Sequence, residues 1–256
     1  MGMVGVHDDN IQAVLACSVG ALLPAELGAV LLAQCSGTGF AGGTVFGITG
    51  VFDMAGPTTE FWQERFEKKE TGWDRGSPSP QLLAWLASGA LRPCRIAVPG
   101  CGSGWEVAEL AQRGFDVVGL DYTAAATTRT RALCDARGLK AEVLQADVLS
   151  YQPEKKFAAI YEQTCLCAIH PDHWIDYARQ LHQWLEPQGS LWVLFMQMIR
   201  PAATEEGLIQ GPPYHCDINA MRALFPQKDW VWPKPPYARV SHPNLSHELA
   251  LQLVRR

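Results

Sequence analysis

From Phe61 onward, short apolar runs alternate with stretches that have a helical pattern of apolar residues. Strands that alternate with crossover helices predict a parallel sheet with helices on both faces. The strand-like runs are RIAV (95–98), DVVGL (116–120), AEVLQ (141–145), FAAIY (157–161), SLWVLFMQM (190–198), DWVWP (229–233) and HELALQLV (247–254), and the helical stretches are residues 61–70, 78–89, 104–113, 123–138, 170–187 and 216–225. Because the last two runs have no helix between them, they favour an antiparallel hairpin at one edge. We therefore expect an α/β fold with a Rossmann-like, doubly wound, mostly parallel seven-stranded sheet and an antiparallel C-terminal edge.

The first 55 residues differ in composition from the rest of the chain. They hold 10 of the 23 glycines and no lysine or arginine, since Arg65 is the first basic residue. The apolar stretch 11–33 is interrupted by Pro24 and Glu26, and it has no positive flank, so it predicts neither a signal peptide nor a membrane span. We expect residues 1–55 to be a glycine-rich leader, disordered or dispensable. Residues 56–256 then form one functional domain that starts near Met54.

Charge and cysteine usage limit the classes of partner. The formal net charge is −5 without a basic stripe, which argues against a nucleic-acid partner. The eight cysteines lack the spacing of a disulfide framework or a zinc site, and this indicates reduced thiols in a cytoplasmic protein without a metal. If Cys165 and Cys167 lie on a strand, both face the same side. We expect a monomer that acts on a small molecule.

A glycine-rich loop, VPGCGSGWE at residues 98–106, directly follows the first predicted strand. Its glycines (Gly100, Gly102 and Gly104) permit a ligand to lie against the backbone, and the next helix offers free N–H groups to an anion. Asp121 ends the second strand, where a carboxylate accepts hydrogen bonds from a ribose diol. Asp147 follows the third strand, where it would meet the amine of adenine. Together these positions predict an adenosine-type cofactor.

A second glycine motif, GTGFAG at residues 37–42, matches the dinucleotide pattern G-x-G-x-x-G. It lacks the required context, because GTVFGITG is too rich in glycine for the following helix and Asp53 lies too close for the ribose acid. The loop at Gly100 has the different spacing G-x-G-x-G and no lysine or arginine. A nicotinamide-dependent oxidoreductase is therefore the less favoured alternative.

Four longer segments carry a family resemblance. From Phe61 to Arg256 the chain resembles the class I S-adenosylmethionine-dependent methyltransferases, and more narrowly the thiopurine and thiol/halide methyltransferase family. The matching segments are FWQERFEKKETGWDRGSPSP (61–80), VPGCGSGWEVAELAQRGFDVVGLDYT (98–123), FAAIYEQTCLCAIHPDHW (157–174) and GPPYHCDI (211–218).

The resemblance implies S-adenosyl-L-methionine as cofactor and S-adenosyl-L-homocysteine as product. It implies cofactor contacts from Trp62, Phe66, Trp73, Gly100, Gly102, Gly104, Asp121, Tyr122, Asp147, Val148, Glu162, Gln163 and Thr164. It also implies a substrate-side role for Tyr214, within the segment PPYHC, and His215 beside it is a further candidate for removing a proton.

The resemblance implies methyl transfer to a soft nucleophile, for which we favour the sulfur of a small thiol. Members of the family tend to have tyrosine or arginine where this chain has Gln163, so halides, thiocyanate, selenium or tellurium species and thiopurines stay open as acceptors. A protein that binds S-adenosylmethionine without catalysis is a more distant alternative. The activated cofactor needs alignment and a dry pocket more than a strong base.

Overall fold

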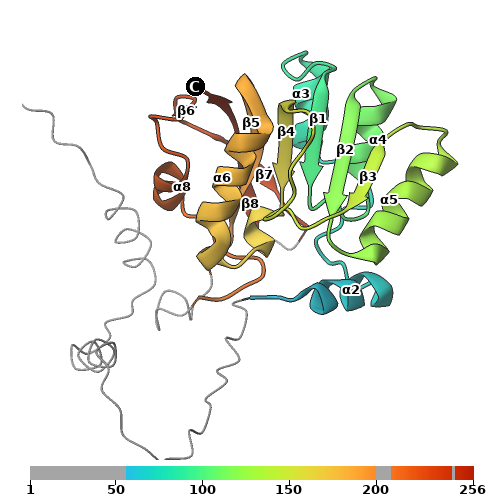
Figure 1. Ribbon diagram of the computed structural model, residues 1–256. Helices are drawn as coiled ribbons and strands as arrows, with labels where there is room; N and C mark the ends of the chain where they lie inside the picture. The colour runs from blue at the N-terminus through green and yellow to red at the C-terminus, as the bar shows by residue number, and fades with distance from the viewer. Residues whose placement is uncertain (1–55, 200–208, 244–245) are drawn as a thin grey trace, which may run out of the picture.

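The computed structural model describes residues 56–199, 209–243 and 246–256 (Figure 1). The predicted leader, including the glycine motif at Gly37 and most of the region around Met54, lies outside the described residues. Within the described ranges, no helix is long and apolar enough to cross a membrane. The same ranges hold no group of three or more His, Cys, Asp or Glu side chains placed to bind a metal ion.

An eight-stranded sheet forms the centre of the structure, in the order β3-β2-β1-β4-β5-β8-β6, and β7 pairs with β8. The strands are β1 (Arg95–Pro99), β2 (Asp116–Asp121), β3 (Glu142–Gln145), β4 (Phe157–Gln163), β5 (Leu185–Gln197), β6 (Trp230–Val231), β7 (Ala238–Ser241) and β8 (His247–Arg255). The first five strands pair in parallel, and β8 pairs antiparallel with β5, β6 and β7. The predicted doubly wound fold with an antiparallel C-terminal edge is confirmed.

The predicted number of seven strands is wrong, because β7 is an additional strand. Its sequence, ARVS, contains a single buried residue, Val240, between exposed neighbours. Such a short run gives almost no periodic signal, and pairing with β8 rather than its own composition makes it a strand.

Helices cover both faces of the sheet (Figure 1), as expected for crossover connections. One core cluster takes buried residues from α3 (Pro80–Ala87), α4 (Trp105–Gln112) and α5 (Ala124–Ala136). The other takes them from α6 (Trp174–Trp184) and α8 (Ile218–Leu224). In Figure 1, α6 lies in front of the sheet and α3 behind it.

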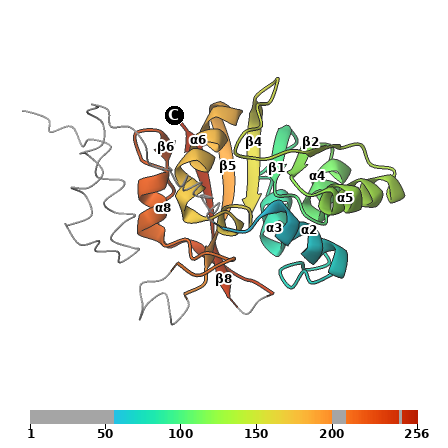
Figure 2. The same cartoon turned by 60° about the horizontal axis from the view of Figure 1, so that its bottom comes forward.

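The helix α2 (Thr59–Lys68) covers neither face but lies beneath the carboxyl ends of the parallel strands (Figures 1 and 2). Its N-terminus is capped by Thr58, whose hydroxyl accepts from the Phe61 N–H at 3.3 Å. Gln63 accepts a hydrogen bond from the Ala125 N–H at 3.1 Å, and the Arg129 guanidinium donates to the Phe66 carbonyl. These contacts with α5 hold α2 over the edge where ligands bind in such sheets.

Two local expectations are wrong. Instead of one helix over 170–187, the chain forms a 3₁₀ turn at Pro171–His173, then α6, and β5 begins directly at Leu185. Cys165 and Cys167 do not lie on a strand, since β4 ends at Gln163 and a 3₁₀ turn follows at Leu166–Ala168. The six cysteines in the described ranges are all free thiols.

Candidate active site

The glycine loop leaves β1 in a conformation that requires glycine. Gly100 and Gly104 have φ angles of +60° and +80°, which side chains rarely adopt. A Cβ atom at Gly104 would lie 2.6 Å from Thr130 Cγ2, and one at Gly100 would lie 2.9 Å from Cys165 Cβ. The loop therefore packs closely against α5 and the segment after β4.

Asp121, at the end of β2, is fixed beside this loop. Its carboxylate accepts from the Gly102 N–H at 3.1 Å and from the Thr123 N–H and hydroxyl at 2.9 and 2.8 Å. The side chain is 7% exposed, and burial raises the pKa of its carboxyl group. A carboxylate has about four acceptor positions, so three donors leave room for a ligand hydroxyl.

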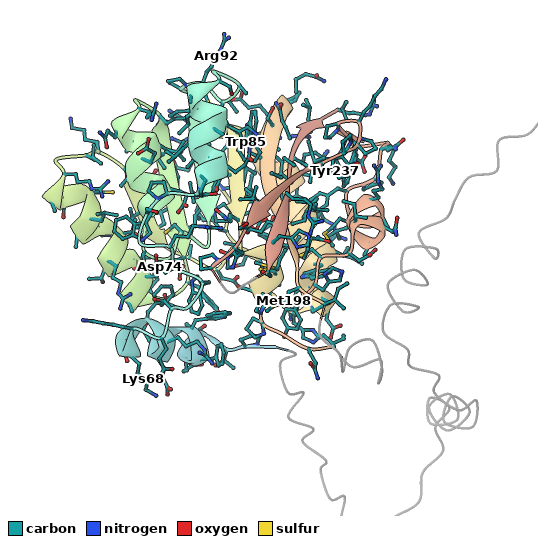
Figure 3. All side chains as sticks on the ribbon, turned by 180° about the vertical axis from the view of Figure 1, so that it is seen from behind. Lys68, Asp74, Trp85, Arg92, Met198 and Tyr237 are labelled. Carbon is teal, nitrogen blue, oxygen red and sulfur yellow. The ribbon has the colours of Figure 1, made fainter. Side chains whose placement is uncertain are left out.

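Aromatic side chains from α2 and the following turn close the site from below. The ring of Trp73 meets Trp62 edge to face at 5.3 Å and meets Phe66 at 5.9 Å. Asp74 ties this turn to the glycine loop, because it accepts from Trp105 Nε1 at 2.8 Å and from the Ser103 hydroxyl. Figure 3 shows Asp74 at the end of the sheet that faces α2, the same end at which Met198 lies.

A cavity of about 1180 Å³ opens between α2 and the strand ends. Ten of the predicted cofactor residues line it, namely Trp62, Phe66, Trp73, Gly100, Gly102, Asp121, Tyr122, Asp147, Val148 and Thr164. Two of these side chains also bond locally, since the Tyr122 hydroxyl donates to the Thr58 carbonyl at 3.4 Å and Asp147 accepts from the Leu149 N–H at 2.9 Å. The structure thus gathers residues from α2, the glycine loop and the ends of β2, β3 and β4 around one space.

A small polar cavity of about 70 Å³ adjoins the large one. Gln163 lines this small cavity and not the large one, together with Asp74 and Arg75. Among the described residues, five line both cavities and mark their junction, namely Trp73, Gly100, Gly102, Thr164 and His242.

Four of the predicted site residues line neither cavity, namely Gly104, Glu162, Tyr214 and His215. Glu162 is 1% exposed, and its carboxylate accepts from the Leu166 N–H at 2.7 Å, so it stabilises the turn after β4. Burial raises the pKa of Glu162 to about 7. Gly104 is the N-cap of α4, where its left-handed backbone conformation joins the glycine loop to the helix. Tyr214 is 5% exposed, and its ring packs edge to face on the cavity-lining His170 at 5.4 Å.

His215 also lies away from both cavities. Its Nδ1 is buried and has no hydrogen-bond partner within the described part of the chain. Burial lowers the pKa of its imidazole. The substrate-side segment therefore reaches the cavity through its prolines and not through Tyr214 or His215.

Sequence reasoning missed several residues of the site. Asp74 and Arg75 stand inside the segment 61–80 that resembles the family, so their position was visible although their role was not. His242 is a lone histidine after an unpredicted strand, and no pattern singles it out. Glu248 is buried in β8 and accepts from Gln163 Nε2 at 2.8 Å, across a separation of 85 residues that no local motif reports.

The residues present fit S-adenosylmethionine in three respects. Asp121 keeps acceptor capacity for a ribose hydroxyl at the wall of the large cavity. The small cavity is lined by an anionic and a cationic side chain, Asp74 and Arg75, which suits a zwitterionic amino-acid group. Trp73, at the junction, presents an aromatic ring where a sulfonium cation would link these two parts.

Known proteins with similar sequences are methyltransferases. The family model of thiopurine S-methyltransferase matches residues 57–232. A probable thiol methyltransferase 2 of Arabidopsis thaliana is 31% identical over 160 residues, covering 62% of this chain and 68% of that protein. The thiopurine S-methyltransferase of Pseudomonas putida (strain GB-1) is 27% identical over 173 residues, which are 60% of this chain and 76% of that protein.

Solved structures show the same fold at low identity. The 1,6-didemethyltoxoflavin-N1-methyltransferase of Burkholderia thailandensis superposes with a TM-score of 0.62 at 17% identity, over 77% of this chain and 86% of that one. The magnesium protoporphyrin IX methyltransferase of Synechocystis PCC 6803 gives 0.60 at 15% identity, over 77% and 99%. The family match covers well over half of the chain and includes α2, the glycine loop and β4. The chain therefore belongs to the thiopurine S-methyltransferase family and is an S-adenosylmethionine-dependent methyltransferase.

Proposed function

We propose that this enzyme transfers the methyl group of S-adenosylmethionine to the sulfur of a small, apolar thiol. The observation that carries the proposal is the extent of the large cavity. Ligand pockets that enclose one drug-sized molecule measure about 300 to 1,000 Å³, and this cavity reaches about 1180 Å³ with a separate small cavity at one end. The space is sufficient for a cofactor together with an organic acceptor.

The part of the cavity wall that the proposed cofactor residues do not form is available to the methyl acceptor. The cofactor residues occupy the side of the cavity formed by the glycine loop and the ends of β2 and β3. The remaining wall includes Cys167, Ala168 and Ile169 after β4, Met196 at the end of β5, and the two prolines at 212–213, together with His170 and His173. This wall is mostly apolar, and a soft, apolar nucleophile loses little hydration there.

The cofactor supplies a methyl group that its sulfonium charge already activates. The chain's residues then have to hold both reactants in line and to exclude water. In our proposal Asp121 binds the ribose, Asp147 and Val148 border the adenine, and Trp62 with Trp73 covers the sulfonium. Phe66, Tyr122 and Thr164 complete the wall of the cavity, while Gly100, Gly102 and Gly104 shape its floor.

Gln163 and Glu162 contribute differently in this proposal. Gln163 borders the small cavity, where its amide meets the amino-acid end of the cofactor. Glu162 supports the turn that carries Thr164, so its role is structural. Tyr214 and His215 line neither cavity, and we assign them to the support of the acceptor wall.

An acceptor panel tests the proposal. The full-length protein is incubated with S-adenosylmethionine and, in turn, thiophenol, phenylmethanethiol, 2-mercaptoethanol, 6-mercaptopurine, iodide, thiocyanate and a selenol, and S-adenosylhomocysteine is quantified. We expect the highest kcat/KM for the apolar thiols. A preference for iodide or thiocyanate would favour the alternative suggested by the thiocyanate methyltransferase 1 of Arabidopsis thaliana, which is 29% identical over 167 residues. Tight cofactor binding without any turnover would favour a non-catalytic binding protein.

We further propose that residues 56–256 form a cytoplasmic, monomeric catalytic domain with no nucleic-acid partner. The family match begins at residue 57, and the described cysteines are free. Deletion of residues 1–53 should leave kcat/KM unchanged within a factor of about two, and size-exclusion chromatography with light scattering should give the monomer mass. Lost activity in the deletion variant would contradict the proposed boundary.

A further inference from the structure

The junction of the two cavities marks the position of the reacting centre. If the adenosyl part of the cofactor occupies the large cavity and its amino-acid part the small one, the sulfur that joins these parts lies between them. The residues that line both cavities therefore surround this sulfur and its methyl group. This step rests on the proposed function, and it limits the groups near the reaction to five described residues, Trp73, Gly100, Gly102, Thr164 and His242.

One side chain of these five is a titratable group. The two glycines have no side chain, and the Trp73 ring accepts no proton. The Thr164 hydroxyl donates to the carbonyl of Gln163 at 2.6 Å, so its proton is already committed to the backbone. His242 is the junction residue whose side chain carries a ring nitrogen of the kind that accepts protons in general-base catalysis.

Two hydrogen bonds fix the backbone at His242 and at the preceding Ser241. The His242 N–H donates to the Ser246 carbonyl at 3.0 Å, which closes the turn between β7 and β8. Arg75, two residues beyond Trp73, donates from its guanidinium to the carbonyl of Ser241. The segment that carries Trp73 is thereby joined to the segment that carries His242, and the histidine is 5% exposed.

Two other histidines line the large cavity but not the junction. His170 and His173 lie on the turn before α6, at the acceptor end. Nδ1 of His170 accepts from the Asp172 N–H at 3.3 Å, and its ring packs against Tyr214. These residues are placed to contact an acceptor, while His242 is placed next to the bond that forms.

A protonated thiol needs a base to take up its proton during methyl transfer, whereas a thiolate has already lost that proton. A free thiol of the cysteine type has a pKa of about 8.5, so most of it is protonated at neutral pH, while the thiolate is the nucleophile. A positioned general base contributes roughly 10²- to 10⁴-fold to such a step. An acceptor that arrives already ionised gains none of this.

We propose that His242 is the general base that takes the proton from a thiol acceptor during methyl transfer. The acceptor's sulfur forms a bond to the methyl carbon while the bond from that carbon to the cofactor's sulfur breaks. The electron pair of the broken bond stays on the cofactor's sulfur, which becomes a neutral thioether. The thiol proton passes to an imidazole nitrogen of His242 and is released to solvent after the products leave.

The test compares two thiols of different acidity in the full-length protein. 4-Nitrothiophenol is a thiolate at neutral pH, whereas phenylmethanethiol keeps its proton. We expect His242→Gln to lower kcat/KM for phenylmethanethiol by about 10²-fold or more, and to lower it for 4-nitrothiophenol by less than about tenfold. His173→Gln is the matched control, because His173 lines the large cavity alone. It should change both values by the same factor.

Two readouts besides turnover accompany the kinetics. Calorimetry with S-adenosylhomocysteine should give the same Kd for His242→Gln and wild type within a factor of about three, which shows an intact cofactor site. NMR of the S-adenosylhomocysteine complex should show the imidazole C–H signal of His242, identified by its absence in the variant, shifting when 4-nitrothiophenolate is added. Equal losses for the two thiols in His242→Gln, or an unshifted signal, would overturn the proposal. If the wild type binds the cofactor yet methylates neither thiol, the proposed function itself fails.

Discussion

The amide of Gln163 and the carboxyl group of Glu248 form a 2.8 Å hydrogen bond that links β4 to β8 across the intervening strand β5. The other end of the same amide accepts from the Tyr161 hydroxyl at 2.6 Å. Glu248 is fully buried, its second oxygen has no partner among the described residues, and Arg75 Nη2 lies 3.8 Å from the first. Gln163 therefore has a single fixed orientation at the small cavity.

The burial of Glu248 predicts that stability falls as pH rises. Desolvation raises the pKa of Glu248 to about 8, from 4.5 for the free group. Between these values the folded state holds a proton that the unfolded state has released, so the free energy of unfolding decreases with increasing pH in this interval. In chemical denaturation, we expect the free energy of unfolding to be lower at pH 9 than at pH 6 by on the order of 1 to 3 kcal/mol.

Glu248→Gln supplies the matched variant for this measurement. Glutamine keeps the shape and an acceptor for Gln163 but has no proton to lose, so the difference between pH 6 and pH 9 should shrink. Glu162→Gln serves as comparison, because the pKa of Glu162 is raised only to about 7 and its share of the decrease ends at lower pH. A pH dependence identical in wild type and Glu248→Gln would show that Glu248 ionises freely in the folded protein.

Removal of the Asp121 carboxylate should weaken cofactor binding. We expect Asp121→Ala to cost about 1.5 to 3 kcal/mol in the free energy of S-adenosylhomocysteine binding, the usual range for hydrogen bonds to a charged group. Because the carboxylate also accepts from Gly102 and Thr123, the variant should unfold at lower temperature as well. Calorimetry at a temperature well below the melting transition separates the two effects. An unchanged Kd would mean that the ribose lies elsewhere.

Gly104 and Gly114 have similar backbone conformations, so their alanine variants can be compared to measure the effect of close packing at the glycine loop. Gly104 and Gly114 have φ angles of +80° and +84°, so alanine is strained by a similar amount at both, about 1 to 3 kcal/mol. A Cβ at Gly104 would meet Thr130 at 2.6 Å, whereas nothing lies within 4 Å of one at Gly114. Gly104→Ala should therefore destabilise the protein clearly more than Gly114→Ala in urea denaturation. It should also weaken S-adenosylhomocysteine binding, which Gly114→Ala should leave unchanged.

Much of the cofactor half was predictable, because its residues follow from local sequence and from the geometry of parallel strands. A glycine loop after one strand and acids after the next two must meet at the same edge, and the structure brings Gly100, Asp121 and Asp147 to one cavity. The aromatic turn with Trp62 and Trp73 was visible only through the family resemblance, since tryptophans at that spacing equally suit a core.

The other residues of the site are brought together by contacts between segments far apart in the sequence, which no local pattern predicts. The partner of Gln163 lies on the last strand, and a buried Glu248 in an apolar run gives no sign of which residue it meets. His242 follows β7, a strand stabilised by its pairing with β8 and too short to show a pattern. Glu162 and Tyr214 were expected to face the ligand, but Glu162 accepts from the Leu166 N–H and Tyr214 packs on His170, because side-chain direction in loops is set by tertiary contacts.

The position of Trp73 predicts that this enzyme distinguishes its cofactor from its product by charge. S-Adenosylmethionine carries a sulfonium cation and S-adenosylhomocysteine a neutral thioether, and an aromatic face attracts a cation by about 0.5 to 2 kcal/mol. Because Trp73 lines both cavities, its replacement by leucine should raise the Kd for S-adenosylmethionine roughly 2- to 30-fold more than the Kd for S-adenosylhomocysteine. Trp73→Phe keeps a ring and should preserve most of the difference. Calorimetry measures the Kd for both ligands. A loss of apolar packing alone would raise the two Kd values by the same factor.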